Sequence, residues 1–327
     1  MFARVWGRIT RSKVGRGQAR FISNMSQRSP LDIEEIKTFD HWIASPKVFS
    51  LEACLHPDHL SDLFITLPTR DGTRKPFETP RISADLPYGH HLVFFHARRA
   101  EPLLRADGTD EDASPPAPFL RRMWAGGRIK WEAKNPLVIG QKATATSTIT
   151  SVEKKGFDKA NPKVFVTQTI ALSVEGAAKP SVIEERDHVY FPIFAEKGDR
   201  TPRAVTNIPA SVDFSFQYRP TPVTLFRFSA LTFNAHHIHL DKEYTLRVEK
   251  YPERLVHGPL TALMLLETVV FNHPKVRIQT FEYRATNPLF AHRNLTINGV
   301  WTSESVAKLW CVDEDGVVGM TGLVNVL

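Results

Sequence analysis

Residues 225–266 read LFRFSALTFNAHHIHLDKEYTLRVEKYPERLVHGPLTALMLL, and this stretch carries the most recognisable chemistry in the chain. Three histidines lie close together in its first half, at His236, His237 and His239. In the second half, His257 and a Gly-Pro pair precede an apolar run whose residues favour a helix. Groups that exchange protons therefore stand next to the predicted start of a helix.

The second half of the stretch predicts a helix that begins at Pro259. Proline is favoured at the first helical position because its missing N–H would have no partner there, and apolar residues follow at helical spacing. Gly258 lets another backbone or a ligand come close, and unpaired N–H groups at a helix N-terminus favour negative charge. Two interpretations stay open here: half of an oxyanion site, or a turn that opens a core helix.

The three histidines allow three interpretations. Histidine has the side-chain pKa nearest neutrality, so the group can take and give protons. Histidines also bind zinc, but no Cys, Asp or Glu stands at a convincing ligand spacing, and Cys54 and Cys311 are isolated. The third interpretation is a set of structural histidines. We expect no metal, and proton transfer and a structural role both stay open.

Residues 230–239, ALTFNAHHIH, resemble the hydratase motif of the MaoC-like (R)-specific enoyl-thioester hydratases and dehydratases. In this hot-dog family, Ala-Leu-Ser-Gly-Asp-x-Asn-Pro-Leu-His is followed by a His-Gly helix start. The alignment needs no gap and puts the family's catalytic His on His239 and its Asn on His236. The family's catalytic Asp falls on Asn234, which is a departure. With Asp241 following, the variant resembles the two-domain branch related to fungal mitochondrial hydroxyacyl-thioester dehydratase type 2 and mesaconyl-CoA hydratase.

The resemblance implies a hydro-lyase that reversibly removes water from a (R)-3-hydroxyacyl thioester to give a trans-2-enoyl thioester. This reaction needs a base for the C2 proton, an acid for the hydroxyl and donors for the thioester oxygen. We expect His239 to be the acid/base, the Asn234 amide to hold the water and the Gly258 N–H to polarise the carbonyl. His236 is expected to replace the missing Asp, and His257 to open the helix and contact substrate. No cofactor is expected.

The composition is that of a globular chain with two domains. Its 327 residues are 42% hydrophobic and include two cysteines, too few for a disulfide framework. No apolar run approaches the roughly twenty residues of a membrane-spanning helix, so we expect no membrane insertion. The net charge of +7 comes from seven basic residues before Asp32, so no nucleic-acid partner is predicted. These residues are Arg4, Arg8, Arg11, Lys13, Arg16, Arg20 and Arg28.

Residues 1–30 resemble a mitochondrial transit peptide. The segment is rich in arginine, contains no acid, and repeats apolar residues at helical spacing. Arg20 stands a few residues before Ser23, as at a processing site, so we expect the mature chain to start near Ser23 in the mitochondrial matrix. A basic tail is the alternative.

Residues 31–191 are expected to form a first hot-dog unit that binds the substrate or its carrier. Residues 31–66 read as helical, and LPYGHHLVFF, residues 86–95, reads as the buried central helix of the unit or as a strand. The composition of residues 98–120 predicts an exposed loop. Strands rich in Val, Thr and Ile are expected at 141–155, 163–174 and 181–191.

Between that loop and those strands lies FLRRMWAGGRIKW, residues 119–131, which resembles the N-terminal signature of the same two-domain branch. Gly126 and Gly127 predict a bulge or a close backbone approach, followed by a strand. Arg122 is a candidate contact for a carrier phosphate and Trp124 for the acyl tunnel; a structural Arg and a core Trp are the alternatives.

Residues 192–209 contain three prolines among charges and are expected to link the first unit to a catalytic unit, residues 210–327. The second unit is predicted to contain a strand, a helix from about Thr221, the histidine segment and the helix from Pro259. Its remaining strands are expected at 276–285, 294–303, 307–313 and 317–326. A helix and a curved antiparallel sheet, twice over, indicate an α+β double hot-dog fold.

Three functions stay open. The first is dehydration of acyl carrier protein or CoA thioesters in mitochondrial fatty acid synthesis. The second is the same chemistry on a short dicarboxylyl-CoA such as mesaconyl-CoA, which an arginine at the distal end of the acyl pocket would favour. The third is a non-catalytic acyl-thioester-binding subunit. Two units in one chain make a pseudo-dimer, so we expect a monomer or a homodimer. Arg98, Arg99, Arg121 and Arg122 form a candidate patch for an acidic carrier.

Overall fold

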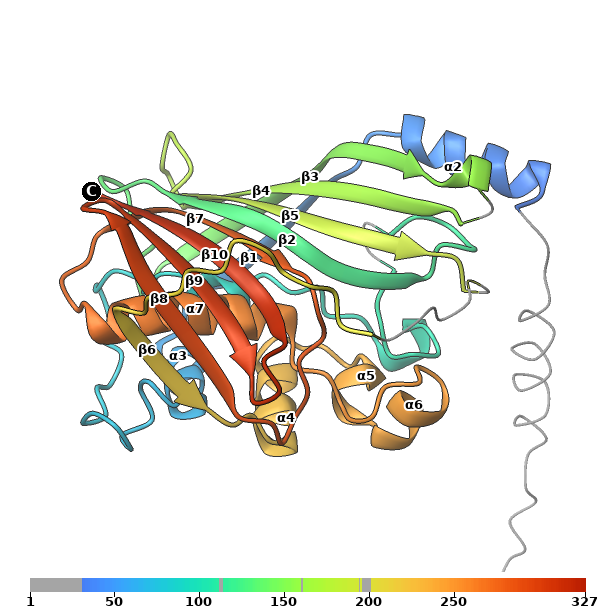
Figure 1. Cartoon of the computed structure of the whole chain (residues 1–327). Helices are drawn as coiled ribbons and strands as arrows, with labels where there is room; N and C mark the ends of the chain where they lie inside the picture. Colours follow the sequence, from blue (N-terminus) through green and yellow to red (C-terminus); the bar gives the residue numbers. More distant parts are fainter. Residues whose placement is uncertain (1–30, 112–113, 160, 194, 196–200) are drawn as a thin grey trace, which may run out of the picture.

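The computed structural model describes residues 31–111, 114–159, 161–193, 195 and 201–327 (Figure 1). The transit-peptide interpretation falls on residues 1–30 and so lies outside the described residues. Within the described ranges, ten strands pair antiparallel in one sheet, in the order β1-β3-β4-β5-β2-β7-β10-β9-β8-β6. The strands are β1 Val48–Cys54, β2 Arg121–Trp131, β3 Lys142–Lys155, β4 Lys163–Val174, β5 Val182–Phe191, β6 Phe214–Tyr218, β7 Ile278–Ala285, β8 Leu295–Ser303, β9 Val306–Asp313 and β10 Val318–Val326.

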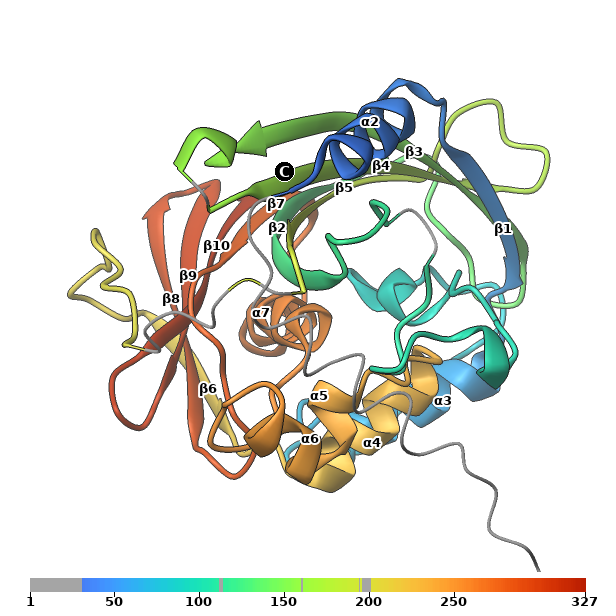
Figure 2. The ribbon, with the colours of Figure 1, turned by 90° about the vertical axis from the view of Figure 1, so that its right-hand side faces the viewer.

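The two halves of the sheet have the same strand order. From the outer edge to the centre, each half places its first strand, then its third, fourth, fifth and second: β1-β3-β4-β5-β2 and β6-β8-β9-β10-β7. No internal repeat is visible in the sequence, but the topology repeats. Together with the curvature of the sheet around its contents, this is the α+β double hot-dog that the resemblance implied (Figure 2).

The halves join where β2 pairs with β7, and two glycines make this pairing fit. A Cβ on Gly126 would lie 2.6 Å from the carbonyl oxygen of Tyr283, and one on Gly127 would lie 2.7 Å from the Tyr283 hydroxyl and 2.2 Å from the carbonyl oxygen of Glu185 on the other neighbouring strand, β5. The pairing of β2 with β5 also shifts register between Trp124 and Gly126. The sequence predicted a bulge or a close approach, and both are present.

The second half of the sheet wraps around the helix α7, Gly258–Asn272 (Figure 2). Every residue from Leu260 to Val269 is buried, and the run is mostly apolar because no face meets water; its polar residues Thr261, Glu267 and Thr268 are buried too. The other helices are α2 Ile33–Ala44, α3 Pro57–Thr66, α4 Pro222–Leu231, α5 His237–Leu240 and α6 Lys242–Arg247. The predicted strands of the second unit and the helices near Thr221 and Pro259 are confirmed.

The first half lacks a long central helix, so the expectation for residues 86–95 is wrong. Only one 3-10 turn forms there, His90–Val93, after Gly89 at φ 79°. Two buried carboxylates hold this turn: His90 Nε2 lies 2.8 Å from Glu267 of α7, and His91 Nε2 lies 3.2 Å from Glu184 of β5. Because no long helix fills the space under the first half of the sheet, this space is open as a pocket.

Two further expectations for the first unit are corrected. Residues 31–66 are not helical throughout, because β1 lies between α2 and α3 and pairs with β3 at the sheet edge. The segment 98–120 is not wholly exposed, because Gly108, Thr109 and Ser114 are buried. The other strands of this unit are confirmed. The division into domains at 192–209 stays a prediction.

Candidate active site

The histidine segment leaves α4 through a sharp turn. Phe233 has φ 50°, in the left-handed region, and the hydratase motif quoted above has glycine at this position. After the turn, the Asn234 N–H donates to the Ser229 carbonyl at 2.8 Å, which ties the start of the segment to the end of α4. The turn places Asn234, His236, Ile238 and His239 along the pocket wall.

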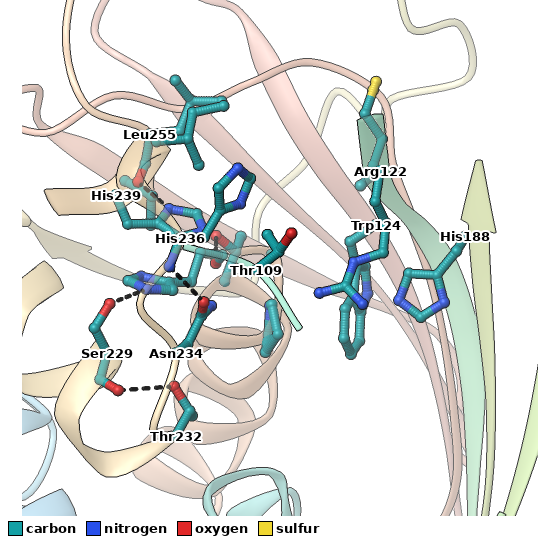
Figure 3. Close-up of a pocket in the computed structure, with 18 of the residues that line it drawn as sticks. Thr109, Arg122, Trp124, His188, Ser229, Thr232, Asn234, His236, His239 and Leu255 are labelled. Carbon is teal, nitrogen blue, oxygen red and sulfur yellow. Dashed lines mark hydrogen bonds between the residues drawn. The ribbon is translucent and has the colours of Figure 1, made fainter. Parts of the chain in front are cut away.

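The Asn234 side chain is fixed by the backbone that follows it. Its Oδ1 accepts a hydrogen bond from the His236 N–H at 3.0 Å, the pattern of an Asx turn. Because an N–H needs an acceptor, the amide atom that faces the His236 N–H must be the oxygen Oδ1. The other amide atom is therefore the donor Nδ2. Asn234 lines the pocket, so a hydrogen-bond donor is available there (Figure 3).

His239 is held in one tautomer. Its Nδ1–H donates to the Leu255 carbonyl at 2.8 Å, and Nε2 bonds to no residue in the described ranges (Figure 3). Burial lowers the pKa of His239 to about 4; the Leu255 hydrogen bond opposes this effect and nearby Arg122 adds to it. The ring is therefore neutral near pH 7, with a lone pair on Nε2 that can accept a proton.

His257 is the N-cap of α7, and its ring stacks on the His239 ring. The two imidazoles stack with centroids 3.7 Å apart and an interplanar angle of 22°. His257 is 1% exposed, and its Nε2 shares a 2.9 Å hydrogen bond with the Ser229 hydroxyl. Burial keeps the pKa of His257 well below its usual value, so the base of the site carries no charge.

Gly258 begins α7 directly after His257, and its N–H has no hydrogen-bond acceptor among the described residues. A Cβ at Gly258 would lie 3.1 to 3.3 Å from atoms of Trp124. Trp124 of β2 therefore packs against the helix N-terminus, where the unpaired N–H groups favour an anion. The two elements that the sequence singled out separately meet at this point.

His236 completes the group of rings. Its ring lies edge-on to His239 with centroids 5.6 Å apart, and its Nε2 lies 3.8 Å from Asp107 Oδ2. Burial and the neighbouring His239 together lower the pKa of His236 to about 3, although Asp107 opposes the effect. His237 points elsewhere, since its ring packs on Tyr244 at 5.4 Å.

The opposite wall of the pocket is built by the first half of the sheet. Arg122 and Trp124 extend from β2, and His188 of β5 packs edge-on to Trp124 at 5.3 Å (Figure 3). The Arg122 guanidinium hydrogen-bonds the Tyr190 side chain; burial opposes the charge, but Tyr190, Asp110 and Asp107 raise the pKa of Arg122. Arg121 lies 3.6 Å from Glu249, so the arginines 98, 99, 121 and 122 do not form one uncompensated patch.

The pocket between these walls has a volume of about 1400 Å³ and continues under the first half of the sheet. Four of its features were not predicted from the sequence: the Leu255 carbonyl, the Ser229 hydroxyl, the Asp107 carboxylate and the His188 ring. The Leu255 carbonyl belongs to the main chain, so no residue type marks it in the sequence. Ser229, Asp107 and His188 lie outside the hydratase motif. Asp241 caps α6 by accepting from the Tyr244 N–H at 3.0 Å, so it has a local structural role.

Across the described ranges, no three His, Cys, Asp or Glu side chains are grouped as metal ligands. None of the helices in those ranges is long and apolar enough to cross a membrane.

Known proteins place this site in a family. The profile of hydroxyacyl-thioester dehydratase type 2 matches residues 89–291, more than half of the chain and both walls of the pocket. The chain belongs to this family. Mesaconyl-C(4)-CoA hydratase of Chloroflexus aurantiacus is 35% identical over 217 residues, which cover 66% of this chain and 75% of that protein. The mitochondrial hydroxyacyl-thioester dehydratase type 2 of Schizosaccharomyces pombe is 29% identical over 234 residues, 64% of this chain and 76% of that protein.

These relatives are hydratases or dehydratases by name, and the chain is a hydro-lyase. The fold agrees with this membership. A crystal structure of a MaoC-like dehydratase from Phytophthora capsici superposes with a TM-score of 0.63 at 12% identity, over 91% of this chain and 99% of that one. The non-catalytic interpretation of Asn234 is therefore not supported.

Proposed function

We propose that the chain catalyses the reversible dehydration of (R)-3-hydroxyacyl thioesters to trans-2-enoyl thioesters. The observation that supports this most directly is the hydrogen bond from His239 Nδ1–H to Leu255, because it leaves Nε2 free as a base on the pocket wall. Asn234 stands in the same turn, and the unpaired N–H of Gly258 begins the neighbouring helix.

In the hydration direction, the Asn234 amide holds a water next to C3 of the enoyl thioester. The water oxygen attacks C3 while His239 Nε2 takes one of its protons, and His239 then delivers that proton to C2. Negative charge builds up on the thioester oxygen between these steps, and the Gly258 N–H at the start of α7 stabilises it. One water thus supplies both the hydroxyl and the hydrogen, and the reverse order gives dehydration.

The remaining site residues bind substrate in this proposal. His236 and His257 form the pocket floor next to the reacting carbons, and Trp124 covers Gly258 along the acyl or pantetheine tunnel. Arg122 is the cation on the opposite wall. The substrate is carried by CoA or by an acyl carrier protein in mitochondrial fatty acid synthesis, a role supported by the name of the Schizosaccharomyces pombe relative and by the arginine-rich N-terminus.

The test is hydration of crotonyl-CoA and of crotonyl acyl carrier protein by the full chain, followed by loss of enoyl-thioester absorbance. We expect the (R) product, and we expect His239→Ala to lower turnover about 10²- to 10⁴-fold. An (S) product, or equal rates with and without the His239 ring, would overturn the proposal. The carrier with the higher kcat/KM identifies the physiological thioester, and import of the chain into isolated mitochondria with cleavage near Ser23 tests the location.

A second candidate substrate is a short dicarboxylyl-CoA such as mesaconyl-CoA. Arg122 favours it, because a guanidinium on the pocket wall suits a carboxylate on the substrate. Arg122→Met should then raise KM for mesaconyl-CoA at least tenfold and leave crotonyl-CoA unchanged. Arg128→Met, which changes an exposed cation on the same strand, is the matched control. An equal effect of Arg122→Met on both substrates would assign Arg122 to the CoA or carrier portion instead.

A further inference from the structure

A loop of the first half reaches the histidine segment of the second half and is locked against it. The Asp107 carbonyl accepts a hydrogen bond from the His237 N–H at 2.8 Å. Gly108 follows with φ 82°, and a Cβ there would lie 2.1 Å from the Ala235 carbonyl oxygen. No larger residue fits between the two backbones, so the position of Asp107 relative to the histidines is set by main-chain packing.

The two oxygens of the Asp107 carboxylate have different surroundings. Oδ1 accepts from the Thr109 N–H at 3.0 Å and from the Thr109 hydroxyl at 2.7 Å, which fixes the plane of the carboxylate. Oδ2 faces His236, whose Nε2 lies 3.8 Å away. This distance exceeds a hydrogen bond, and such bonds commonly shorten when substrate is bound. The side chains are 18% exposed for His236 and 23% for Asp107.

The charged and titratable groups near His236 are Asp107, His239, His237, His257 and Arg122. Asp107 is the anion of this set. The hydratase motif has a carboxylate at the position of Asn234, whose amide is neutral. Asp107 is therefore the carboxylate that lies next to the His236 and His239 rings.

We propose that Asp107 is a positioning residue that compensates for the missing carboxylate by holding His236 in the Nε2–H tautomer. With Nε2–H directed at Asp107 Oδ2, the His236 Nδ1 carries a lone pair and accepts a hydrogen bond from the attacking water. The proton itself still moves from the water to His239 and on to C2, so no additional proton transfer is involved. Without Asp107, His236 adopts both tautomers, and the Nδ1–H form donates where an acceptor is needed. This inference rests on the proposed hydration chemistry.

The kinetic test uses Asp107→Asn. This variant keeps Oδ1 as the acceptor for Thr109 and replaces the charged Oδ2, which faces His236, with a neutral amide nitrogen. We expect kcat to fall about 10- to 100-fold, within the range for a positioned acid or base, with KM changed less than twofold. In a His236→Ala background, Asp107→Asn should change kcat less than twofold, because the partner is already absent. Glu111→Gln removes an exposed charge from the same loop and should leave kcat unchanged.

An Asp107→Asn effect that persists in full without His236 would overturn the proposal, as would an unchanged kcat. A second measurement does not depend on turnover: ¹⁵N NMR of histidine-labelled full chain, with His236 assigned by its loss in the His236→Ala protein. We expect Nε2–H at His236 in the wild type and a mixture of tautomers in Asp107→Asn. An Nδ1–H signal in the wild type would overturn the inference even if the enzyme is active. If no thioester is hydrated but the tautomer responds to Asp107→Asn, the proposed function fails and the Asp107–His236 pair stands.

Discussion

His239 and Leu255 are joined by a 2.8 Å hydrogen bond from the imidazole Nδ1–H to a main-chain carbonyl. A main-chain acceptor is the same whatever side chain stands at Leu255, so the tautomer of His239 is set by the fold. This bond aims the other ring nitrogen at the pocket, and it explains why the motif specifies the histidine and leaves its partner unmarked.

Replacing His239 should remove most of the activity. His239→Ala takes away the proton acceptor, and we expect kcat to fall about 10²- to 10⁴-fold, the usual contribution of a positioned acid or base. The control is His237→Ala, because that ring packs on Tyr244 and is not part of the pocket wall. Steady-state hydration of crotonyl-CoA measures both variants. Equal losses in the two would mean that the segment acts through its fold and not through His239.

Asn234 should matter both for the turn and for holding water. Asn234→Ala removes the Oδ1 that accepts from the His236 N–H and the Nδ2 donor, so we expect kcat to fall about 10- to 100-fold and the melting temperature to decrease. Asn234→Asp keeps the turn acceptor and should lose less on both measures. If the aspartate variant loses more stability than the alanine variant, the turn is not held by this side-chain oxygen. Calorimetry beside the kinetics separates the two effects.

Phe233 should be replaceable by glycine at no cost in stability. Its φ of 50° lies in the left-handed region, which costs an L-residue about 1–2 kcal/mol, and its side chain is 59% exposed, so little burial is lost. We expect Phe233→Gly to keep the free energy of unfolding or raise it, and Phe233→Ile to lower it by about 1 kcal/mol or more. Urea unfolding of the two variants decides, and a less stable glycine variant would contradict the expectation.

Stability should fall as the pH drops from 7 to 5. Burial lowers the pKa of His90 in the folded chain to about 4, against an ordinary value of 6.5, although Glu267 opposes the effect. A lowered folded pKa means that the unfolded chain binds the proton more readily, so stability is full above about pH 6.5 and is lost as the pH falls towards 4. His90 alone should account for about 2 kcal/mol between pH 7 and pH 5.

Urea unfolding at the two pH values checks this, with His90→Gln as the variant and His41→Gln, at an exposed histidine, as its control. The pH-dependent loss of unfolding free energy should be smaller in His90→Gln and unchanged in His41→Gln. An identical loss in all three proteins would show that His90 is not the group that titrates.

Local patterns predicted the second unit well, and they also predicted three strands of the first unit. Pro259 marked the start of α7 to within one residue, and alternating Val, Thr and Ile marked β3, β4 and β5. These signals are local, since a cap or an alternation involves neighbouring residues. The hydratase motif likewise located His239 and Asn234 on one turn. Their catalytic roles stay predictions.

The first unit was harder because its structure depends on contacts between distant residues. The strand β1 alternates exposed and half-buried residues with the period of a strand, but this signal is only seven residues long and lies between two amphipathic helices. His90 and His91 form only one turn because they reach Glu267 and Glu184, far away in sequence. Asp107 was read as part of an exposed loop for the same reason. Its partner His236 lies in the other half of the chain.

The repeated strand order has a consequence for how such an enzyme arises. Two copies of one unit that associate as a symmetric dimer must share every feature, so both keep the central helix and any space lost to it. Once both units are in a single chain, each can change alone. Here one unit has kept its helix, whose N-terminus lies at the site, and the other has given up that volume. The asymmetry lets one half supply the helix N-terminus and the other half supply the space for the substrate.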